Sequence, residues 1–114
     1  MKFYNSISPN PKMVRMFMAE RGLNIDTQEV DIMAAENRGD EYVKRNPRGQ
    51  IPCLELDDGT VLAEITVICE YLDEINGTSD LVGTTPLARA TTRMWMRRAD
   101  LYVCEPLANG FRFA

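Results

Sequence analysis

The stretch Asn46-Pro47-Arg48-Gly49-Gln50-Ile51-Pro52 decides the fold of this chain. Pro47 ends the preceding helical segment, because the residue before a proline is pushed out of the helical region and the ring offers no N–H. Gly49 permits a left-handed or tight backbone that a side chain would obstruct. Pro52 stands directly before an extended run at residues 53–56, where either isomer of its peptide bond is compatible. The stretch therefore predicts a loop between a helix and a strand, with a geometry that suits a peptide-like ligand.

Strands and helices alternate on both sides of this loop. The hydrophobic pattern and the turn residues predict strands at residues 2–4, 27–31, 53–56 and 60–62, and helices at 10–22, at 40–45 and before Gly77. The last two strands are joined by a tight turn at Asp57-Asp58-Gly59. The order strand, helix, strand, helix, strand, strand, helix is that of a thioredoxin-like α/β fold with a mixed four-stranded sheet.

Two of these helices carry clear local signals. Asn10 is the expected N-cap of the first helix, with Pro11 in its first turn. A broad apolar surface of that helix is predicted to be core, and it comprises Met13, Val14, Met16, Phe17 and Met18. The helix that ends at Gly77 has apolar residues at i, i+3, i+4 and i+7, which are Ile68, Tyr71, Leu72 and Ile75.

A linker at residues 77–86 leads to one long predicted helix at residues 87–108, which contains Trp95. This pattern divides the chain into a thioredoxin-like domain at 1–80 and a linker with a helix at 81–114. Three arginines repeat every four residues on one face of the long helix, namely Arg89, Arg93 and Arg97. They are expected to be solvated or to meet acids of a partner subunit, such as Glu70, Asp73 and Glu74.

The composition is that of one compact domain, with 114 residues, 45% hydrophobic and 26% charged. The net charge of −4 argues against nucleic acid as a partner, although residues 1–80 carry −7 and residues 81–114 carry +3. We expect no membrane partner and a cytoplasmic location, because no apolar run approaches the length of a membrane helix and the start lacks a signal peptide. The odd and widely spaced cysteines indicate reduced thiols, and they are Cys53, Cys69 and Cys104.

Four segments together resemble the amino-terminal domain of glutathione transferases. They are Met1-Lys2-Phe3-Tyr4-Asn5-Ser6-Ile7-Ser8-Pro9-Asn10, the proline loop at residues 46–52, the run from Leu56 to Glu64, and Ile68-Cys69-Glu70-Tyr71-Leu72. Their order and spacing agree with the family over roughly residues 1–80. The resemblance implies a cis bond before Pro52, glutathione as co-substrate and an electrophilic small molecule as second substrate.

The resemblance also implies a second, all-helical domain, whose first helix would match residues 87–108. The chain stops soon after, at Phe111-Arg112-Phe113-Ala114. We therefore expect a truncated reading frame or a fragment, in which an open apolar helix face favours pairing with another chain, as in the dimers of the family. A homodimer is the expected assembly.

Ser8 is the predicted catalytic residue. A serine just before a helix can offer its hydroxyl to a thiolate, while the unpaired N–H groups of the helix start add positive potential. The thiolate is the nucleophile, so stabilising it activates glutathione. Ser8-Pro9-Asn10 most resembles bacterial and fungal members with serine or threonine before Pro-Asn. Ser6 and Tyr4 are alternatives, and simple capping of the helix by Ser8 is the non-catalytic explanation.

Glu64 is the second predicted anchor of the site. By resemblance it would accept the α-ammonium of the γ-glutamyl group, whereas compensation of a helix dipole is the simpler explanation. The next residue, which would bind the α-carboxylate, is Ile65 in place of the usual serine or threonine. Ile65 keeps the N–H contact but lacks the hydroxyl contact, which costs about 1.5–3 kcal/mol. Thr66 would compensate in part if its hydroxyl faced the ligand.

Gln50, Ile51, Pro52 and Asn10 complete the predicted glutathione site. By resemblance, the Ile51 main chain would pair with the cysteinyl part, and the Gln50 amide would reach the glycyl end. Many relatives have lysine where Gln50 stands, and a neutral amide holds a carboxylate less firmly. Asn10 is expected near the thiol.

Other chemistries have weaker support. Cys53 is predicted to be strand core, and the chain has no Cys-x-x-Cys pair for a dithiol redox cycle. The absence of histidine removes the usual metal ligand, so no metal is expected. Three functions therefore remain: a glutathione transferase, a non-catalytic relative that serves as a binding or assembly module, and a glutaredoxin-like reductase. The reductase ranks last because it would need a cysteine at Ser8.

Overall fold

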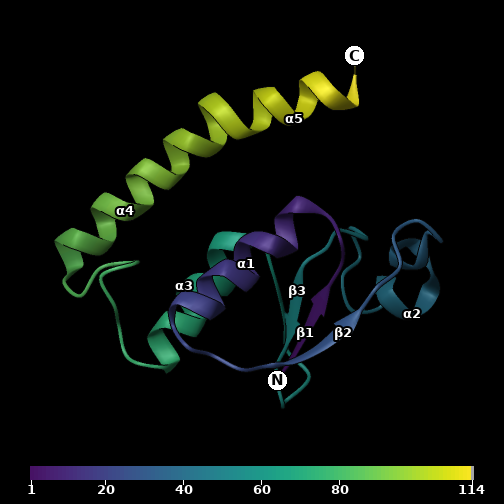
Figure 1. The fold of residues 1–114 in the computed structure, drawn as a ribbon, viewed down its shortest axis with the longest axis horizontal. Coiled ribbons are helices and arrows are strands. Elements are labelled where there is room, and N and C mark those ends of the chain that lie inside the picture. Colours follow the sequence, from purple (N-terminus) through teal and green to yellow (C-terminus); the bar gives the residue numbers. More distant parts are fainter. Residues whose placement is uncertain (114) are drawn as a thin grey trace. The chain divides into compact units, whose positions relative to one another are not determined.

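The computed structural model describes residues 1–113 and divides into two compact units, the first spanning Met1–Leu72 and the second beginning at Asp73. Figure 1 shows the elements in chain order. Those that begin in the first unit are β1 (Lys2–Asn5), α1 (Pro9–Glu20), β2 (Asp26–Glu29), the 3₁₀ turn η1 (Glu36–Arg38), α2 (Asp40–Val43), β3 (Cys53–Glu55), β4 (Val61–Ala63) and α3 (Ile65–Ile75).

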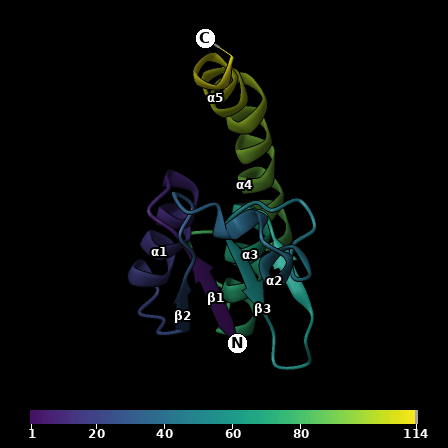
Figure 2. The ribbon, with the colours of Figure 1, turned by 90° about the vertical axis from the view of Figure 1, so that its right-hand side faces the viewer.

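The four strands form one mixed sheet in the order β2-β1-β3-β4. β1 lies between β2 and β3 (Figure 2), pairing in parallel with β2 and antiparallel with β3. β3 also pairs antiparallel with β4. A parallel pair needs a crossover connection, and α1 lies within the connection between β1 and β2. This thioredoxin-like arrangement confirms the predicted fold class.

Side chains of β1 and β3 alternate between two cores, because successive residues of a strand point to opposite faces of the sheet. Phe3 and Leu54 are fully buried on the face covered by α1 and α3, with Val14, Met18, Ile68 and Leu72. Tyr4 and Cys53 are buried on the opposite face, with Val30, Ile51 and, from α2, Tyr42. The sheet thus lies between α1 and α3 on one side and α2 on the other (Figure 1).

The first helix differs from its prediction at two points. It begins at Pro9 with Ser8 in the N-cap position, so Asn10 is not the cap. A proline is well suited to the first helical position because its missing N–H would have no helical partner there. Met13 and Met16 are about half exposed and lie outside the core, so the predicted apolar surface is narrower and consists of Val14, Phe17 and Met18.

The segment after Gly77 is helical beyond the predicted end at residue 108. It consists of α4 (Pro86–Ala99), a π-helical turn at Asp100–Cys104 and α5 (Glu105–Arg112), so the single predicted helix is interrupted. Pro106 is the second residue after the wide turn. Proline has no N–H to donate to the carbonyl four residues earlier, and its ring crowds that carbonyl, which favours a local departure from α-helical bonding. No helix within residues 1–113 is long and apolar enough to cross a membrane.

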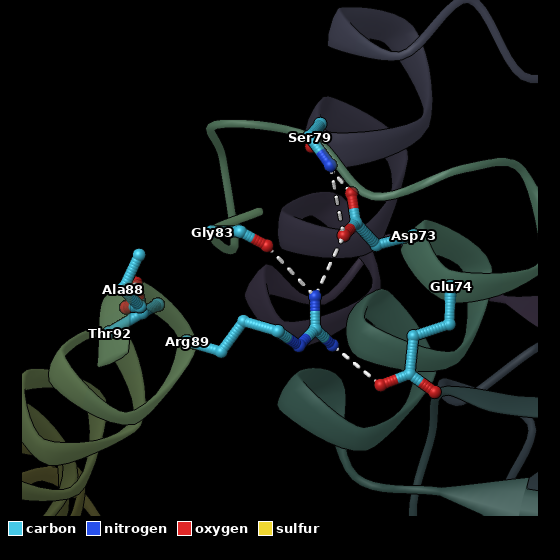
Figure 3. Close-up of polar contacts among 7 residues, drawn as sticks. All are labelled: Asp73, Glu74, Ser79, Gly83, Ala88, Arg89 and Thr92. Atoms are coloured by element: carbon cyan, nitrogen blue, oxygen red, sulfur yellow. Dashed lines mark hydrogen bonds and ion pairs between the residues drawn. The ribbon is translucent and has the colours of Figure 1, made fainter. Parts of the chain in front are cut away.

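Arg89 lies near the start of α4 and binds acids of its own chain (Figure 3). Its Nη1 lies 3.3 Å from Oδ2 of the fully buried Asp73, and its Nη2 lies 2.6 Å from Oε1 of Glu74. Nη1 also donates to the Gly83 carbonyl over 3.1 Å, and the Ser79 hydroxyl donates to Asp73. The prediction that Arg89 is solvated or contacts acids of a partner subunit is therefore wrong. The buried carboxylate of Asp73 needs a charged partner, and Arg89 of the same chain supplies it.

Candidate functional site

One row of residues across the sheet brings the predicted site together. Tyr4 of β1 is paired with Cys53 of β3, and Cys53 is paired with Ala63 of β4. The chain after Tyr4, the chain before Cys53 and the chain after Ala63 therefore leave the sheet at the same end. Neighbouring strands lie about 4.8 Å apart, so these three exits span roughly 10 Å. The serines, the proline loop and Glu64 emerge there.

The proline loop is held by hydrogen bonds to one carbonyl group. The Gln50 carbonyl oxygen accepts from the Tyr42 hydroxyl and from Nδ2 of Asn46, each over 2.6 Å. Tyr42 and Asn46 are both buried, so water does not compete for these bonds. The peptide bond between Ile51 and Pro52 is cis. The loop is thus tied to α2 and to its own first residue, while the Gln50 side chain is exposed.

Gly49 occupies a position that no other residue suits. Its φ is +64°, in the left-handed region, and a Cβ atom there would lie 3.0 Å from the carbonyl oxygen of Asn37. Nδ2 of Asn37 in turn donates to the Gly49 carbonyl over 2.8 Å. The η1 turn therefore approaches the loop closely, and the prediction of a tight backbone at Gly49 is confirmed.

Ser8 does not use its hydroxyl to cap the helix. It occupies the N-cap position of α1, yet its side chain accepts no capping bond. Its Oγ lies 2.7 Å from Oγ of Ser6, and its N–H donates to that same Ser6 oxygen over 3.2 Å. The capping explanation is therefore wrong, and the half-buried Ser8 hydroxyl sits beside the first turn of the helix.

The two alternatives to Ser8 are poorly placed to meet a ligand. Ser6 and Tyr4 are each 1% exposed. The Tyr4 hydroxyl donates to Glu55 over 2.8 Å, and burial, together with that bond, raises the Tyr4 pKa above its usual value. Of these three candidates, Ser8 is the one whose side chain reaches the surface.

A polar chain beneath the serines was missed by the sequence reasoning. Nδ2 of the buried Asn5 donates to Oε1 of Glu29 over 2.6 Å, and the Arg15 guanidinium donates to Oδ1 of Asn5. Arg15 also donates to the Ser6 carbonyl over 3.1 Å. These bonds join β2, β1 and α1 at the end of the sheet where the serines lie. The available signal was a polar residue, Asn5, directly after the predicted first strand.

Glu64 is exposed and has an unusual backbone. Its φ is +74°, a conformation that costs a non-glycine residue roughly 1–2 kcal/mol. Its carbonyl accepts the N–H of Ile68 over 3.0 Å, so Glu64 directly precedes α3. Ile65 is the first residue of that helix and packs against the core of Phe3 and Leu54. An apolar side chain at position 65 therefore has a core partner.

Cys53 is strand core, as predicted. It is 0% exposed within β3, and burial raises the pKa of its thiol. The Tyr42 hydroxyl lies 3.5 Å from its sulfur. A buried thiol with a raised pKa is a poor nucleophile.

Two hollows of the first unit are lined in part by neighbours of these groups. One, of about 260 Å³, is lined by Ile7, Glu29, Val30, Asp31, Ile32 and Glu36. The other, of about 320 Å³, is lined by Met1, Lys2, Tyr4, Asp26, Arg45, Glu55, Leu56 and Asp57. Neither contains Ser8, Gln50 or Glu64. We therefore define the candidate site by the contacts of the serines, the register of the strands and the contacts of the loop, and not by these hollows.

The fold and this end of the sheet define a class of protein. The model of the glutathione S-transferase N-terminal domain family matches residues 7–75, more than half of the chain. The chain therefore belongs to the glutathione S-transferase family through this domain. It is similar to glutathione S-transferase 2 of Saccharomyces cerevisiae, with 37% identity over 108 residues that cover 93% of this chain and 46% of the yeast protein.

Solved structures agree with this assignment. A glutathione S-transferase of class Gtt2 from Vibrio parahaemolyticus superposes with a TM-score of 0.88 at 31% identity, covering 100% of this chain and 58% of that protein. A glutathione transferase homologue from Sulfitobacter, with bound glutathione, gives a TM-score of 0.84 at 28% identity, covering 99% and 56%. The chain spans about half the length of these relatives.

Proposed function

We propose that this chain is a glutathione transferase, or a fragment of one, of the type that uses a serine or threonine. In this reaction the Ser8 hydroxyl donates to the thiolate of bound glutathione. The sulfur then forms a bond to an electrophilic carbon, or to one sulfur of a mixed disulfide, and the leaving group departs with the electron pair. The observation that carries the proposal is that the Ser8 hydroxyl is half-buried at the start of α1 and makes no capping hydrogen bond to the helix.

The remaining predicted contacts fit a tripeptide spread across the end of the sheet. In the part of the chain that is described, the backbone of Ile51 makes no hydrogen bond. Its N–H and C=O are thus available to the cysteinyl part, beside Pro52. Glu64 would take the α-ammonium, and the Ile65 N–H would take the α-carboxylate at the start of α3. The glutathione bound in the Sulfitobacter homologue supports this ligand class.

Gln50 and Asn10 are proposed as outer contacts. Both side chains are exposed, Gln50 on the anchored loop and Asn10 as the second residue of α1. The Gln50 amide would bind the glycyl carboxylate, and Asn10 would approach the thiol.

The larger assembly is also proposed rather than observed. Residues 1–80 would form the glutathione-binding domain, and residues 81–114 would form a linker and the first helix of a helical domain that completes the electrophile site. A cytoplasmic homodimer is the proposed state. Exposed apolar residues of the second unit, among them Trp95, Leu107 and Phe111, support an interface on this segment.

Calorimetric titration with glutathione, combined with the pH dependence of thiolate absorbance, tests the proposal. We expect binding with a thiol pKa below that of free glutathione. Ser8→Ala should raise this pKa and lower the conjugation rate by roughly ten- to a hundredfold, the worth of one hydrogen bond to a charged group. Ser8→Thr, which keeps a hydroxyl, should retain most of the rate. If saturating glutathione gave neither heat nor a thermal shift, the proposal would be wrong.

The alternative is a non-catalytic binding or assembly module with the same fold. The observation that favours it is Ile65, whose side chain packs in the core and supplies no hydroxyl for the α-carboxylate. In that case the parent protein and Ser8→Ala would behave identically in every thiol assay.

A further inference from the structure

The proton of the buried Ser6 hydroxyl has a single hydrogen-bond acceptor within reach. Ser6 is 1% exposed, so water does not reach its side chain. Among residues 1–113, the hydrogen-bond partners of Ser6 Oγ are two atoms of Ser8, the hydroxyl oxygen at 2.7 Å and the backbone nitrogen at 3.2 Å. The backbone N–H of Ser8 can act only as a donor, so it uses one lone pair of Ser6 Oγ. The proton of Ser6 is then left with Ser8 Oγ as its acceptor.

The direction of the bond between the two hydroxyls follows from burial. If Ser8 donated to Ser6, the Ser6 proton would be buried without an acceptor, which is among the more costly states of a polar group. If Ser6 donates to Ser8, the Ser6 hydroxyl is satisfied both as a donor and as an acceptor. Ser8 is half-buried, so its own proton can then point outward to solvent or to a ligand. The second arrangement is therefore the stable one.

We propose that Ser6 is a positioning residue, which donates its proton to Ser8 Oγ and so directs the Ser8 proton toward the thiolate of bound glutathione. This inference rests on the proposed function. A hydroxyl that accepts one hydrogen bond becomes a better donor of the next, because chains of hydrogen bonds polarise one another. Ser6 would thus also strengthen the Ser8 contact without touching the ligand. No proton is transferred in this arrangement, because Ser8 donates a hydrogen bond and keeps its proton.

The backbone around the pair is held in place independently. The Arg15 guanidinium donates to the Ser6 carbonyl over 3.1 Å and to the buried Asn5 side chain. Asn5 in turn donates to Glu29. Removal of the Ser6 hydroxyl takes away the acceptor of the Ser8 N–H but leaves these bonds in place, so the turn stays anchored through Asn5 and the Ser6 carbonyl.

A double-mutant cycle on the full chain tests the inference, with the thiol pKa of bound glutathione as the readout. The variants are Ser6→Ala, Ser8→Ala and the double variant. Ser6→Ala should raise the thiol pKa by roughly 0.3 to 1, the net worth of one neutral hydrogen bond. When Ser8 is already alanine, Ser6→Ala should cause no further rise in the thiol pKa. Ser6→Cys, a weaker donor of similar size, should give an intermediate rise and serves if Ser6→Ala does not fold.

Ser79→Ala is the matched control, because it removes a half-buried hydroxyl bonded to Asp73 in the second unit. It should lower stability without moving the thiol pKa. An equal pKa rise from Ser6→Ala in both backgrounds would show a merely structural role and overturn the inference. If Ser8→Ala raises the thiol pKa and Ser6→Ala leaves it unchanged, the inference is also overturned. The proposed function stands in that case. If Ser8→Ala leaves the pKa unchanged, the proposed function fails and the inference fails with it.

Discussion

The Tyr42 hydroxyl donates to the Gln50 carbonyl oxygen over 2.6 Å, and this bond ties the helix before the proline loop to the loop itself. Tyr42 is 4% exposed, and its ring meets that of Tyr4 edge to face at 5.9 Å. Burial raises the pKa of Tyr42 far above its usual value, so the hydroxyl keeps its proton at any physiological pH. The loop that presents Ile51 is therefore anchored by a contact that does not titrate.

Tyr42→Phe should lower the free energy of unfolding by about 0.5–1.5 kcal/mol, because it removes one hydrogen bond and keeps the ring packing. Asn46 still donates to the Gln50 carbonyl, so the loop should loosen rather than unfold. Urea denaturation measures the loss, and glutathione titration measures any weaker binding. Tyr102→Phe is the control, since Tyr102 is 74% exposed and its loss should have no effect. Equal stabilities of the two variants would contradict the anchoring role.

Gly49→Ala should destabilise the protein more than Gly22→Ala. The two glycines have nearly the same φ, +64° and +63°, so both substitutions carry the left-handed penalty of roughly 1–2 kcal/mol. A Cβ at Gly49 would lie 3.0 Å from the Asn37 carbonyl oxygen, whereas a Cβ at Gly22 has nothing within 4 Å. Parallel denaturation curves isolate the cost of that close approach. A Gly22 variant as unstable as the Gly49 variant would show that φ alone matters.

Arg89→Met should cost about 3–5 kcal/mol, because it leaves the fully buried Asp73 carboxylate without its cation. The aliphatic side chain keeps most of the packing of the arginine stem, so the loss reports the charge. Arg97→Met on the same helix is the control, since Arg97 is exposed, and its effect should be near zero. Guanidinium denaturation followed by circular dichroism compares them. A loss below 1 kcal/mol for Arg89→Met would count against the buried pair as a stabilising contact.

Glu55 should make stability dependent on acid pH. The hydrogen bond from Tyr4, and then that from Arg45 at 3.0 Å, lower the Glu55 pKa below its usual value of 4.5. A depressed native pKa means that the unfolded chain binds the proton first as the pH falls. The contribution of Glu55 is thus complete above pH 4.5 and is lost as the pH falls below that value, through the lowered native pKa.

Urea denaturation between neutral pH and pH values below the Glu55 pKa tests this dependence. The parent protein should lose more stability over that range than Glu55→Gln, which has no proton to gain. Glu41→Gln should follow the parent, because the Glu41 side chain is 83% exposed. Identical pH profiles for the parent and Glu55→Gln would contradict the assigned cause.

The elements themselves were largely predictable, because local chemistry decides them. The glycine at position 49, the turn at Asp57-Asp58-Gly59 and the apolar periodicity of α3 each act over a few residues. The first helix was shifted because Ser8 and Asn10 both precede a proline, and either could have been the cap. The interruption before α5 was missed because the periodicity was followed through Pro106.

The site was predictable only as a set of residue types. Ser8, Ile51 and Glu64 were named from motifs, whereas the paired rows of β1, β3 and β4 bring their segments to one end of the sheet. The left-handed backbone of Glu64 had no sequence signal, because a glutamate does not favour that region.

The sequence by itself determined the fold, the family and the loop that is proposed to contact the ligand, because these depend on turn residues, prolines and hydrophobic spacing along the chain. The tertiary structure alone decided that the Ser8 hydroxyl does not cap the helix, that Ser6 is buried and hydrogen-bonded to Ser8, and that Arg89 pairs with Asp73. Each of these depends on burial and on which groups surround a side chain. Neither quantity can be read from local sequence, because both are set when separate segments pack together.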